Sequence, residues 1–278
     1  MTQDPPEDFS RIEVSRVNGV TRLHLTRPER RNAIDLPLAR ELLRAVHLER
    51  TATSGCVLLT GAGDHFCVGG DLTSFGQAAD LPGHLMQVTG YLHAALSRLA
   101  AMPAPLVVAA QGHVAGAGLG LACLADVLLT DENATYRSAY GAIGLTPDAS
   151  TSHFLPRLVG LRRAQDMTLL GRVIGAEEAL SWGLSTETVP AGSLHERAVE
   201  VAEKLAAGPT TAFGQTKRLL RSSFARTLAD HLEDESHTLS ASAATADARE
   251  GIAAFAARRT PRFGTAGPAA HAWTGGRP

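Results

Sequence analysis

The stretch AAQGHVAGAGLG, residues 109–120, is the part of this sequence that says most about its fold. An apolar run over residues 105–110 precedes the glycines and predicts a buried strand, and the small residues from Leu119 to Ala125 predict the start of a helix. A strand that turns through glycines into a helix leaves backbone N–H groups unpaired at the positive end of the helix dipole. Such groups suit a phosphate or a developing oxyanion. The alternative is a tight packing turn, because one glycine-rich turn is a weak motif.

A second strand-to-glycine turn lies upstream, in LLTGAGDHFCVGGDL at residues 58–72. The apolar residues 56–59 predict a buried strand, and a Gly-Gly-Asp-Leu turn follows it. Two such units can direct two backbone N–H groups into one pocket, where they form an oxyanion hole for a thioester carbonyl. Asp71 within the turn is predicted to be structural, because a short carboxylate there bonds neighbouring N–H groups.

Four motifs make the sequence similar to the crotonase (enoyl-CoA hydratase/isomerase) superfamily: RPERRNAID at 27–35, GAGDHFCVGGDL at 61–72, GHVAGAGLGLACLADV at 112–127 and LPRLVGLRRA at 155–164. The resemblance runs from about Val14 to about Glu250. It implies an α/β fold, a crotonase-like spiral of ββα units with a helical C-terminal trimerisation segment. It also implies an acyl-CoA thioester as substrate and a homotrimer or hexamer as assembly. By this resemblance the two oxyanion amides fall on Gly70 and Ala117.

The composition is that of an ordinary globular chain. It is 44% hydrophobic and 5% aromatic with a formal net charge of −2, which argues against a nucleic-acid partner. The N-terminal residues MTQDPPEDFS lack the basic and apolar regions of a signal peptide, and glycines interrupt the apolar stretch over 106–129, so no membrane span is expected. Three cysteines without CxxC spacing predict reduced thiols in a cytoplasmic protein: Cys56, Cys67 and Cys123.

Hydrophobic periodicity predicts alternating strands and helices up to about residue 150, and helices after it. Strands are expected at 11–17 and 20–26, joined by an Asn-Gly turn, and at 106–110, 126–130 and near residue 135. Helices are expected at 36–49, 85–101, 152–159, 161–170, 176–182, 194–207, 210–223, 227–242 and 246–257. The chain thus divides into a crotonase-like α/β core over 1–190, a helical C-terminal segment over 191–257 and a flexible tail over 258–278.

The sequence departs from the hydratase pattern at the two positions where the resemblance places catalytic glutamates. Gly120 and Tyr140 stand there, so neither water-activating carboxylate is present. Addition of water by the usual pair of glutamates is therefore not expected. Tyr140 is predicted to form a wall of the acyl pocket rather than to donate a proton, and its hydroxyl needs a partner if it is buried.

Asp148, in GLTPDAS at residues 144–150, is the remaining candidate for acid/base chemistry. Its structural alternative is a cap for the helix that follows. The resemblance implies more, because crotonase-type isomerases, including the phenylacetate-pathway ring isomerase, carry an aspartate in a similar Pro-Asp turn that moves a proton between the α and γ carbons. The 4-chlorobenzoyl-CoA dehalogenases also have an aspartate at this place, which attacks the aromatic ring.

His93, in YLHAALSRL at residues 91–99, is the second candidate. Resemblance to the dehalogenases implies that it acts as a base, whereas packing at the rim of an apolar helix face is the alternative. The dehalogenase pattern also has an asparagine before the aspartate and a tryptophan at the Tyr140 position. Pro147 and Tyr140 stand there in this chain, which weighs against the dehalogenase interpretation.

The resemblance places the CoA moiety against Arg31, Val68 and Lys217. Arg31 belongs to a cluster with Arg27 and Arg30, for which a solvated surface is the alternative. The eleven histidines show no HExxH and no ligand cluster, so no metal is expected. No turn has the full dinucleotide fingerprint, so no cofactor is expected beyond the coenzyme A of the substrate.

The sequence therefore predicts an acyl-CoA enzyme that isomerises the double bond of an enoyl-CoA, with Asp148 as acid/base and with His93 and Tyr140 shaping the pocket. One alternative is a 4-halobenzoyl-CoA dehalogenase or acyl-CoA hydrolase with Asp148 as nucleophile and His93 as base. The others are an enoyl-CoA hydratase and a non-catalytic acyl-CoA binder.

Overall fold

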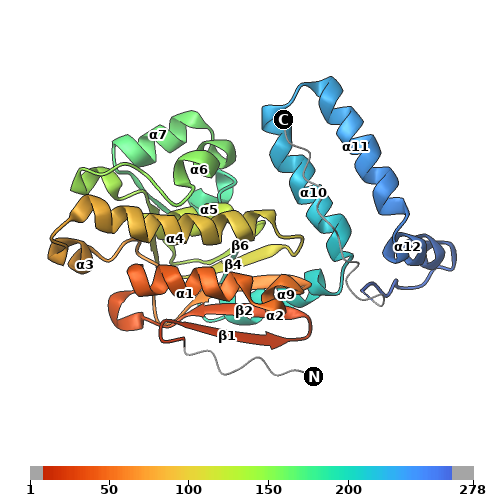
Figure 1. Cartoon of the computed structure of the whole chain (residues 1–278), viewed down its shortest axis with the longest axis horizontal. Helices are drawn as coiled ribbons and strands as arrows, with labels where there is room; N and C mark the ends of the chain where they lie inside the picture. Colours follow the sequence, from red (N-terminus) through yellow and green to blue (C-terminus); the bar gives the residue numbers. More distant parts are fainter. Residues whose placement is uncertain (1–8, 265–278) are drawn as a thin grey trace.

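The computed structural model describes residues 9–264, which are arranged around two sheets (Figure 1). The larger sheet has the strand order β1-β2-β3-β4-β6-β9 and the smaller one β5-β7-β8. The larger sheet comprises β1 (Ile12–Val17), β2 (Val20–Leu25), β3 (Cys56–Gly61), β4 (Leu106–Ala110), β6 (Val127–Asp131) and β9 (Glu187–Val189). The smaller sheet comprises β5 (His113–Ala115), β7 (Thr135–Arg137) and β8 (Val173–Gly175).

The first two strands form the predicted hairpin. Asn18 (φ 49°) and Gly19 (φ 78°) are both left-handed, as a two-residue type I′ turn requires. The remaining neighbours in the larger sheet are parallel. The carboxyl ends of β3 and β4 therefore lie at the same edge, and both glycine-rich turns start there.

Helices cover both faces of the larger sheet. On one face lie α1 (Leu36–His47) and α4 (Leu81–Ala101), and on the other lies α9 (Leu194–Ala206) (Figure 1). Alternate residues of β2 and β3 point to the two faces, so Leu59 joins the first core and Leu58 the second. The predicted boundary at residue 190 thus precedes a helix that packs on the core sheet.

Two helices start earlier than the sequence predicts. The N-terminus of α4 is Leu81 rather than residue 85, because Asp80 caps it through a hydrogen bond of 3.1 Å from the Gly83 N–H. The helix after the second glycine turn, α5 (Ala117–Leu124), starts at Ala117 rather than at Leu119. Gly116, with φ 51°, makes that early start possible by turning the chain sharply.

After residue 150 the other helices follow the predicted ranges closely. Before residue 150 the structure also contains short helical elements that the sequence did not predict. Before it lie η1 (Pro28–Arg30), α2 (Glu49–Ala52), α3 (Leu72–Gln77) and η2 (Tyr140–Ile143). After it lie α6 (Thr151–Val159), α7 (Leu161–Leu169), α8 (Ala176–Ser181), α10 (Thr210–Ser222), η3 (Ser223–Ala225), α11 (Leu228–Ala243) and α12 (Ala246–Ala256).

The C-terminal helices α10, α11 and α12 stand beside the sheet rather than on it (Figure 1). A buried ion pair ties α10 to the core, since Lys217 Nζ lies 2.6 Å from Asp126 Oδ2 and donates to the Ala104 carbonyl over 2.9 Å. Arg221 approaches the other Asp126 oxygen at 3.1 Å. Asp126 directly precedes β6, so this charged cluster fixes α10 against the end of the sheet.

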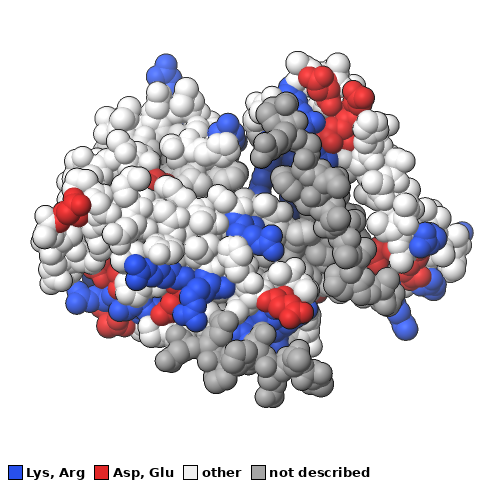
Figure 2. All heavy atoms as spheres, in the orientation of Figure 1, with Lys and Arg blue, Asp and Glu red and all other residues white. Residues whose placement is uncertain are grey.

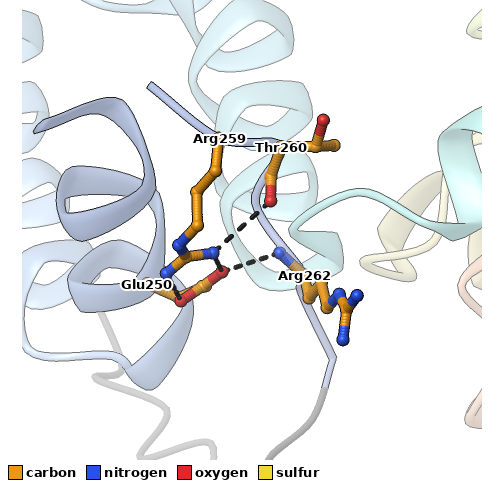
Figure 3. Close-up of a pocket in the computed structure, with 4 residues that line it drawn as sticks. All are labelled: Glu250, Arg259, Thr260 and Arg262. Atoms are coloured by element: carbon orange, nitrogen blue, oxygen red, sulfur yellow. Dashed lines mark hydrogen bonds and ion pairs between the residues drawn. The ribbon is translucent and has the colours of Figure 1, made fainter. Parts of the chain in front are cut away.

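The first residues of the predicted flexible tail, 258–264, run back along α12 (Figure 3). Arg259 donates to both carboxylate oxygens of Glu250, at 2.6 and 2.8 Å, and the Arg262 N–H donates to the same group at 2.8 Å. These residues line a hollow, and the two charged groups Glu250 and Arg259 in its wall already pair with each other. Residues 265–278 of the predicted tail lie outside the described part of the chain. Within the described part, no helix has the length and apolarity that crossing a membrane requires.

Candidate active site

The two glycine-rich turns lie side by side. The Ala115 N–H donates to the Cys67 carbonyl at 3.0 Å, and a Cβ added to Gly69 would lie 3.2 Å from the Ala117 nitrogen. Glycine at position 69, with φ 95°, therefore permits both the turn and the close approach. Ile34 bonds the residues on either side of Gly70 and holds this first turn in place.

The Gly70 and Ala117 amides have the properties of oxyanion donors. Within the described part of the chain, neither N–H donates a hydrogen bond to the protein, and both residues line the same cavity. Ala117 is the first residue of α5, so its N–H is free by position and carries the positive end of the helix dipole. Two such donors can stabilise negative charge on a thioester oxygen.

The cavity beside these amides has a volume of about 250 Å³. Its walls come from α3, α4 and the segment after β7, and they are mostly apolar. Among the described residues that line it, Asp148 carries the one carboxylate. A single carboxylate in an apolar pocket beside two candidate oxyanion donors is the arrangement expected for acid/base chemistry at an acyl group.

Tyr140 holds one oxygen of the Asp148 carboxylate. Its hydroxyl donates a hydrogen bond of 2.5 Å to Oδ1. Burial raises the pKa of the Tyr140 phenol well above its ordinary value, and the negative charge of Asp148 raises it further. The hydroxyl therefore stays protonated as a donor. The sequence predicts a wall at Tyr140, and the residue lines the cavity while it also orients Asp148.

The turn after Asp148 explains the glycine at position 120. Ala149 and Ser150 are both left-handed, with φ 48° and 67°, and the Ala149 carbonyl oxygen lies 2.1 Å from where a Cβ on Gly120 would sit. A glutamate at position 120 is therefore incompatible with this turn. The Asp148 side chain does not cap α6, whose N-cap residue, Ser150, makes no side-chain cap bond.

His93 contacts the same turn from α4. Its Nε2 accepts a hydrogen bond of 3.2 Å from the Ala149 N–H and lies 3.9 Å from Asp148 Oδ2. A nitrogen that accepts an N–H bond is unprotonated, so the proton of a neutral His93 belongs on Nδ1. The lone pair that a general base would use is already engaged. His93 thus lies close to Asp148 but is placed to support the turn.

The residues assigned to CoA divide into two groups. Arg31 is exposed, and its carbonyl accepts from the Val68 N–H at 3.3 Å, so Arg31 adjoins the cavity that Val68 lines. Blue atoms gather over neighbouring α1 in Figure 2, while the surface over α4 to α6 is mostly uncharged. Lys217 is buried against Asp126, so in this structure its ammonium is not available to a CoA phosphate.

Arg27 is not part of a solvated cluster. It is buried between Asp35, at 3.2 Å, and Asp71, at 3.1 Å, because these carboxylates replace the water that its charge needs. Asp71 also caps α3, as predicted. Although burial opposes it, the bonds from the Ser74 N–H and from Arg27 hold the pKa of Asp71 below its ordinary value.

The cysteines offer no nucleophile in the described part of the chain. All three are buried free thiols, and burial raises the pKa of each to about 12. A thiol with such a pKa is not a thiolate near neutral pH. Asp148 thus remains the candidate for the chemistry of the cavity.

The chain belongs to the enoyl-CoA hydratase/isomerase family, whose model matches residues 15–266. This confirms the resemblance read from the motifs, and the chain is an enzyme of the crotonase superfamily. The 1,2-epoxyphenylacetyl-CoA isomerase of Escherichia coli (strain K12) is 36% identical over 251 residues, which cover 88% of this chain and 95% of the relative. The 4-chlorobenzoyl coenzyme A dehalogenase-2 of an Arthrobacter species is 34% identical over 247 residues, 88% of this chain and 90% of the relative.

The fold has close counterparts among solved structures. The crystal structure of an enoyl-CoA hydratase from Bacillus anthracis matches with a TM-score of 0.84 at 28% identity and covers 91% of this chain and 99% of that chain. The similarity extends over nearly the whole described chain. The predicted crotonase-like fold is therefore confirmed.

Sequence reasoning missed two contributors to the site. One is the Ala149 backbone, whose carbonyl packs on Gly120 and whose N–H bonds His93. The other is Phe75, whose ring lies 2.5 Å from where a Cβ on Gly70 would sit. The glycine that ends GAGLG was the one signal for the first contact, and no motif marks the second.

Proposed function

We propose that this enzyme isomerises the double bond of an enoyl-CoA thioester and that Asp148 moves the proton. The observation that carries the proposal is the position of the Asp148 carboxylate in the cavity that the Gly70 and Ala117 amides share. Tyr140 occupies Oδ1, which leaves Oδ2 to face the substrate. The absence of the two hydratase glutamates at positions 120 and 140 supports the same reaction.

In this mechanism the thioester oxygen accepts hydrogen bonds from the Gly70 and Ala117 N–H groups. Both bonds strengthen as charge develops on the oxygen, which makes the α-proton of a 3-enoyl ester acidic. Asp148 removes that proton, and the electron pair delocalises into a dienolate. The carboxylic acid then returns the proton to the γ carbon, which leaves a 2-enoyl ester and the original carboxylate. No cofactor takes part beyond the coenzyme A of the substrate.

Replacement of Asp148 by Asn tests the proposal, because it keeps the shape and removes the base. Turnover of a 3-enoyl-CoA should fall at least about 100-fold, the usual contribution of a general acid/base. Binding of the ester, measured by calorimetry, should change little. Retained turnover, or loss of binding together with turnover, would contradict the role of Asp148.

A second candidate is hydrolytic dehalogenation of a 4-halobenzoyl-CoA, with Asp148 as nucleophile and His93 as base. The 3.9 Å between His93 Nε2 and Asp148 Oδ2 favours it. The intact mass of the protein after mixing with the halobenzoyl ester distinguishes the two functions. A covalent adduct on Asp148 would support dehalogenation. We expect none, because Pro147 and Tyr140 stand where the dehalogenase pattern has an asparagine and a tryptophan.

His93→Gln separates the two roles of that residue. The Gln side-chain oxygen can accept the Ala149 N–H bond but cannot act as a base. We expect His93→Gln to keep most of the isomerase activity that His93→Leu loses. An equal loss of isomerase activity in both variants would indicate that His93 acts as a base.

We further propose Arg31 and the Val68 backbone as contacts of the CoA moiety and a homotrimer or hexamer as the assembly. Exposed apolar side chains on the C-terminal helices support the assembly, among them Leu239 at 73% and Phe255 at 88% exposure. A cytoplasmic location is proposed as well, supported by three free cysteines.

A further inference from the structure

The acyl cavity offers no counterion to a second negative charge. Its apolar wall comes from Phe75 and, on α4, from Leu85, Val88 and Leu92. Thr89 also lines it, but its hydroxyl donates to the Leu85 carbonyl at 2.8 Å. Among the described residues that line this cavity there is no Arg, Lys or His, and the charged group present is the Asp148 carboxylate. His93 lies behind that carboxylate, where its Nε2 accepts from the Ala149 N–H.

We infer that the cavity accepts a compact, uncharged acyl group and rejects an acyl group of equal length that ends in a carboxylate. The inference rests on the proposed function, because it takes the cavity beside Gly70 and Ala117 to be the acyl site. It adds a substrate class that the reaction type leaves open.

Charge supplies the first reason. An ionised carboxylate that enters an apolar cavity loses its hydration, and no cation in the wall replaces it. It also comes near Asp148, and two carboxylates in one pocket repel each other. Tyr140 does not supply a hydrogen bond to the substrate carboxylate, because its hydroxyl already donates to Asp148. The discrimination therefore comes from repulsion and desolvation rather than from shape.

Size supplies the second reason. At about 250 Å³ the cavity lies below the roughly 300–1,000 Å³ of pockets that hold drug-sized ligands. The wall on α4 is fixed from behind, because Val88 and Leu92 are buried in the main core with α1. A compact acyl group therefore fills the cavity, and a longer one meets the packed wall on α4.

The test compares two substrates of equal chain length, 3-hexenoyl-CoA and the mono-CoA ester of 3-hexenedioic acid. We expect kcat/KM for the uncharged ester to exceed that for the carboxylated ester by at least about 100-fold. Equal values would overturn the inference and leave the isomerase proposal standing.

If neither ester is isomerised, that result contradicts the proposed function and leaves the inference untouched. A binding measurement then tests the inference on its own. Hexanoyl-CoA and adipyl-CoA differ by the same terminal carboxylate and need no reaction. We expect the Kd of adipyl-CoA to be at least about 10-fold weaker by calorimetry. Equal affinity would contradict the inference whatever the catalysis.

A variant of the wall tests the cause. Thr89→Arg places a cation where the cavity has none, and Thr89→Gln serves as its neutral control of similar length. We expect Thr89→Arg to narrow the ratio between the two hexenoyl esters at least about 10-fold relative to Thr89→Gln. An unchanged ratio in a folded Thr89→Arg protein would show that charge does not set the preference.

Discussion

The Tyr140 hydroxyl and the Asp148 carboxylate are 2.5 Å apart, and this contact occupies one of the two carboxylate oxygens. Oδ1 accepts from Tyr140, while Oδ2 faces His93 at 3.9 Å. His93 in turn accepts from the Ala149 N–H and steadies the left-handed turn that follows Asp148. Tyr140 therefore holds the carboxylate and His93 supports the turn that carries it, and the Asp148 motif alone reveals neither contact.

Replacement of Tyr140 by Phe removes the hydroxyl and keeps the wall. A hydrogen bond to a charged group contributes about 1.5–3 kcal/mol, so kcat should fall about 10- to 150-fold. KM should change little, because the ring still lines the cavity. Steady-state kinetics of the 3-enoyl ester measure both, with Tyr91→Phe on the exposed side of α4 as control. An unchanged kcat would mean that Tyr140 only packs.

At the scale of elements, α5 and the turn that follows Asp148 pack closely against each other. Gly120 lies in the fully buried α5, and the Ala149 carbonyl oxygen fills the space that a side chain would need. A glutamate at position 120 and the present Asp148 turn exclude each other in this fold. The chain therefore differs from the hydratase pattern through a linked pair of features rather than through one missing residue.

Gly120→Ala should destabilise the protein by about 1–3 kcal/mol, the usual effect of forcing an extra methyl group into a packed site. Gly90→Ala is the matched control, because Gly90 lies in α4 with nothing within 4 Å of its missing Cβ. That control should gain up to about 1 kcal/mol from better helix propensity. Urea unfolding measures both changes. Equal stability of the two variants would show that the Asp148 turn yields to the methyl group.

The two glycine-rich turns are also joined by a pair of histidines. The rings of His65 and His113 stack with centroids 4.5 Å apart, and His65 Nδ1 accepts from the His113 N–H at 3.1 Å. Burial lowers the pKa of His65 below its ordinary value of 6.5, and the charges of His113 and Arg31 lower it further, while Asp64 opposes them. Protonation of His65 would break the Nδ1 bond.

This pair predicts a loss of stability in acid. The folded pKa of His65 lies below the unfolded one, so the unfolded chain binds more protons and stability falls as pH drops below about 6.5. Urea unfolding at about pH 7.5 and about pH 5.5 measures the fall. His65→Gln, which cannot be protonated, should make the fall smaller than in the wild type. If stability falls equally in both proteins, the acid sensitivity originates at another group. His24 and His153 are examples, because burial lowers their pKa values as well.

At the scale of the whole molecule, the sequence predicted most of the long elements and the family. Amphipathic helices such as α9 and α11, and the hairpin at Asn18, carry their signal in local periodicity. The strands β5, β8 and β9 were not predicted, because three residues give no periodic pattern and each strand pairs with a segment distant in the chain. The contacts of the Asp148 turn with His93 and Gly120 were not predicted either, because they join residues far apart in the chain.

The arm formed by α10 to α12 leaves large apolar side chains exposed in a single chain, including Leu228 at 74% and Ile252 at 70%. Such surfaces usually mark a contact between proteins. Light scattering after gel filtration should therefore give the mass of a trimer or hexamer. The double variant Ile252→Ser with Phe255→Ser should dissociate, whereas Val17→Ser on the hairpin should not. A monomeric wild type would contradict the proposed assembly.

The most direct test of the account is the mass and retention time of the product that the full-length protein forms from a 3-enoyl-CoA. We predict a product of unchanged mass and shifted retention, because Asp148 returns the proton that it removes. A product that has gained one water would contradict this account. It would show that the cavity activates water without the two hydratase glutamates.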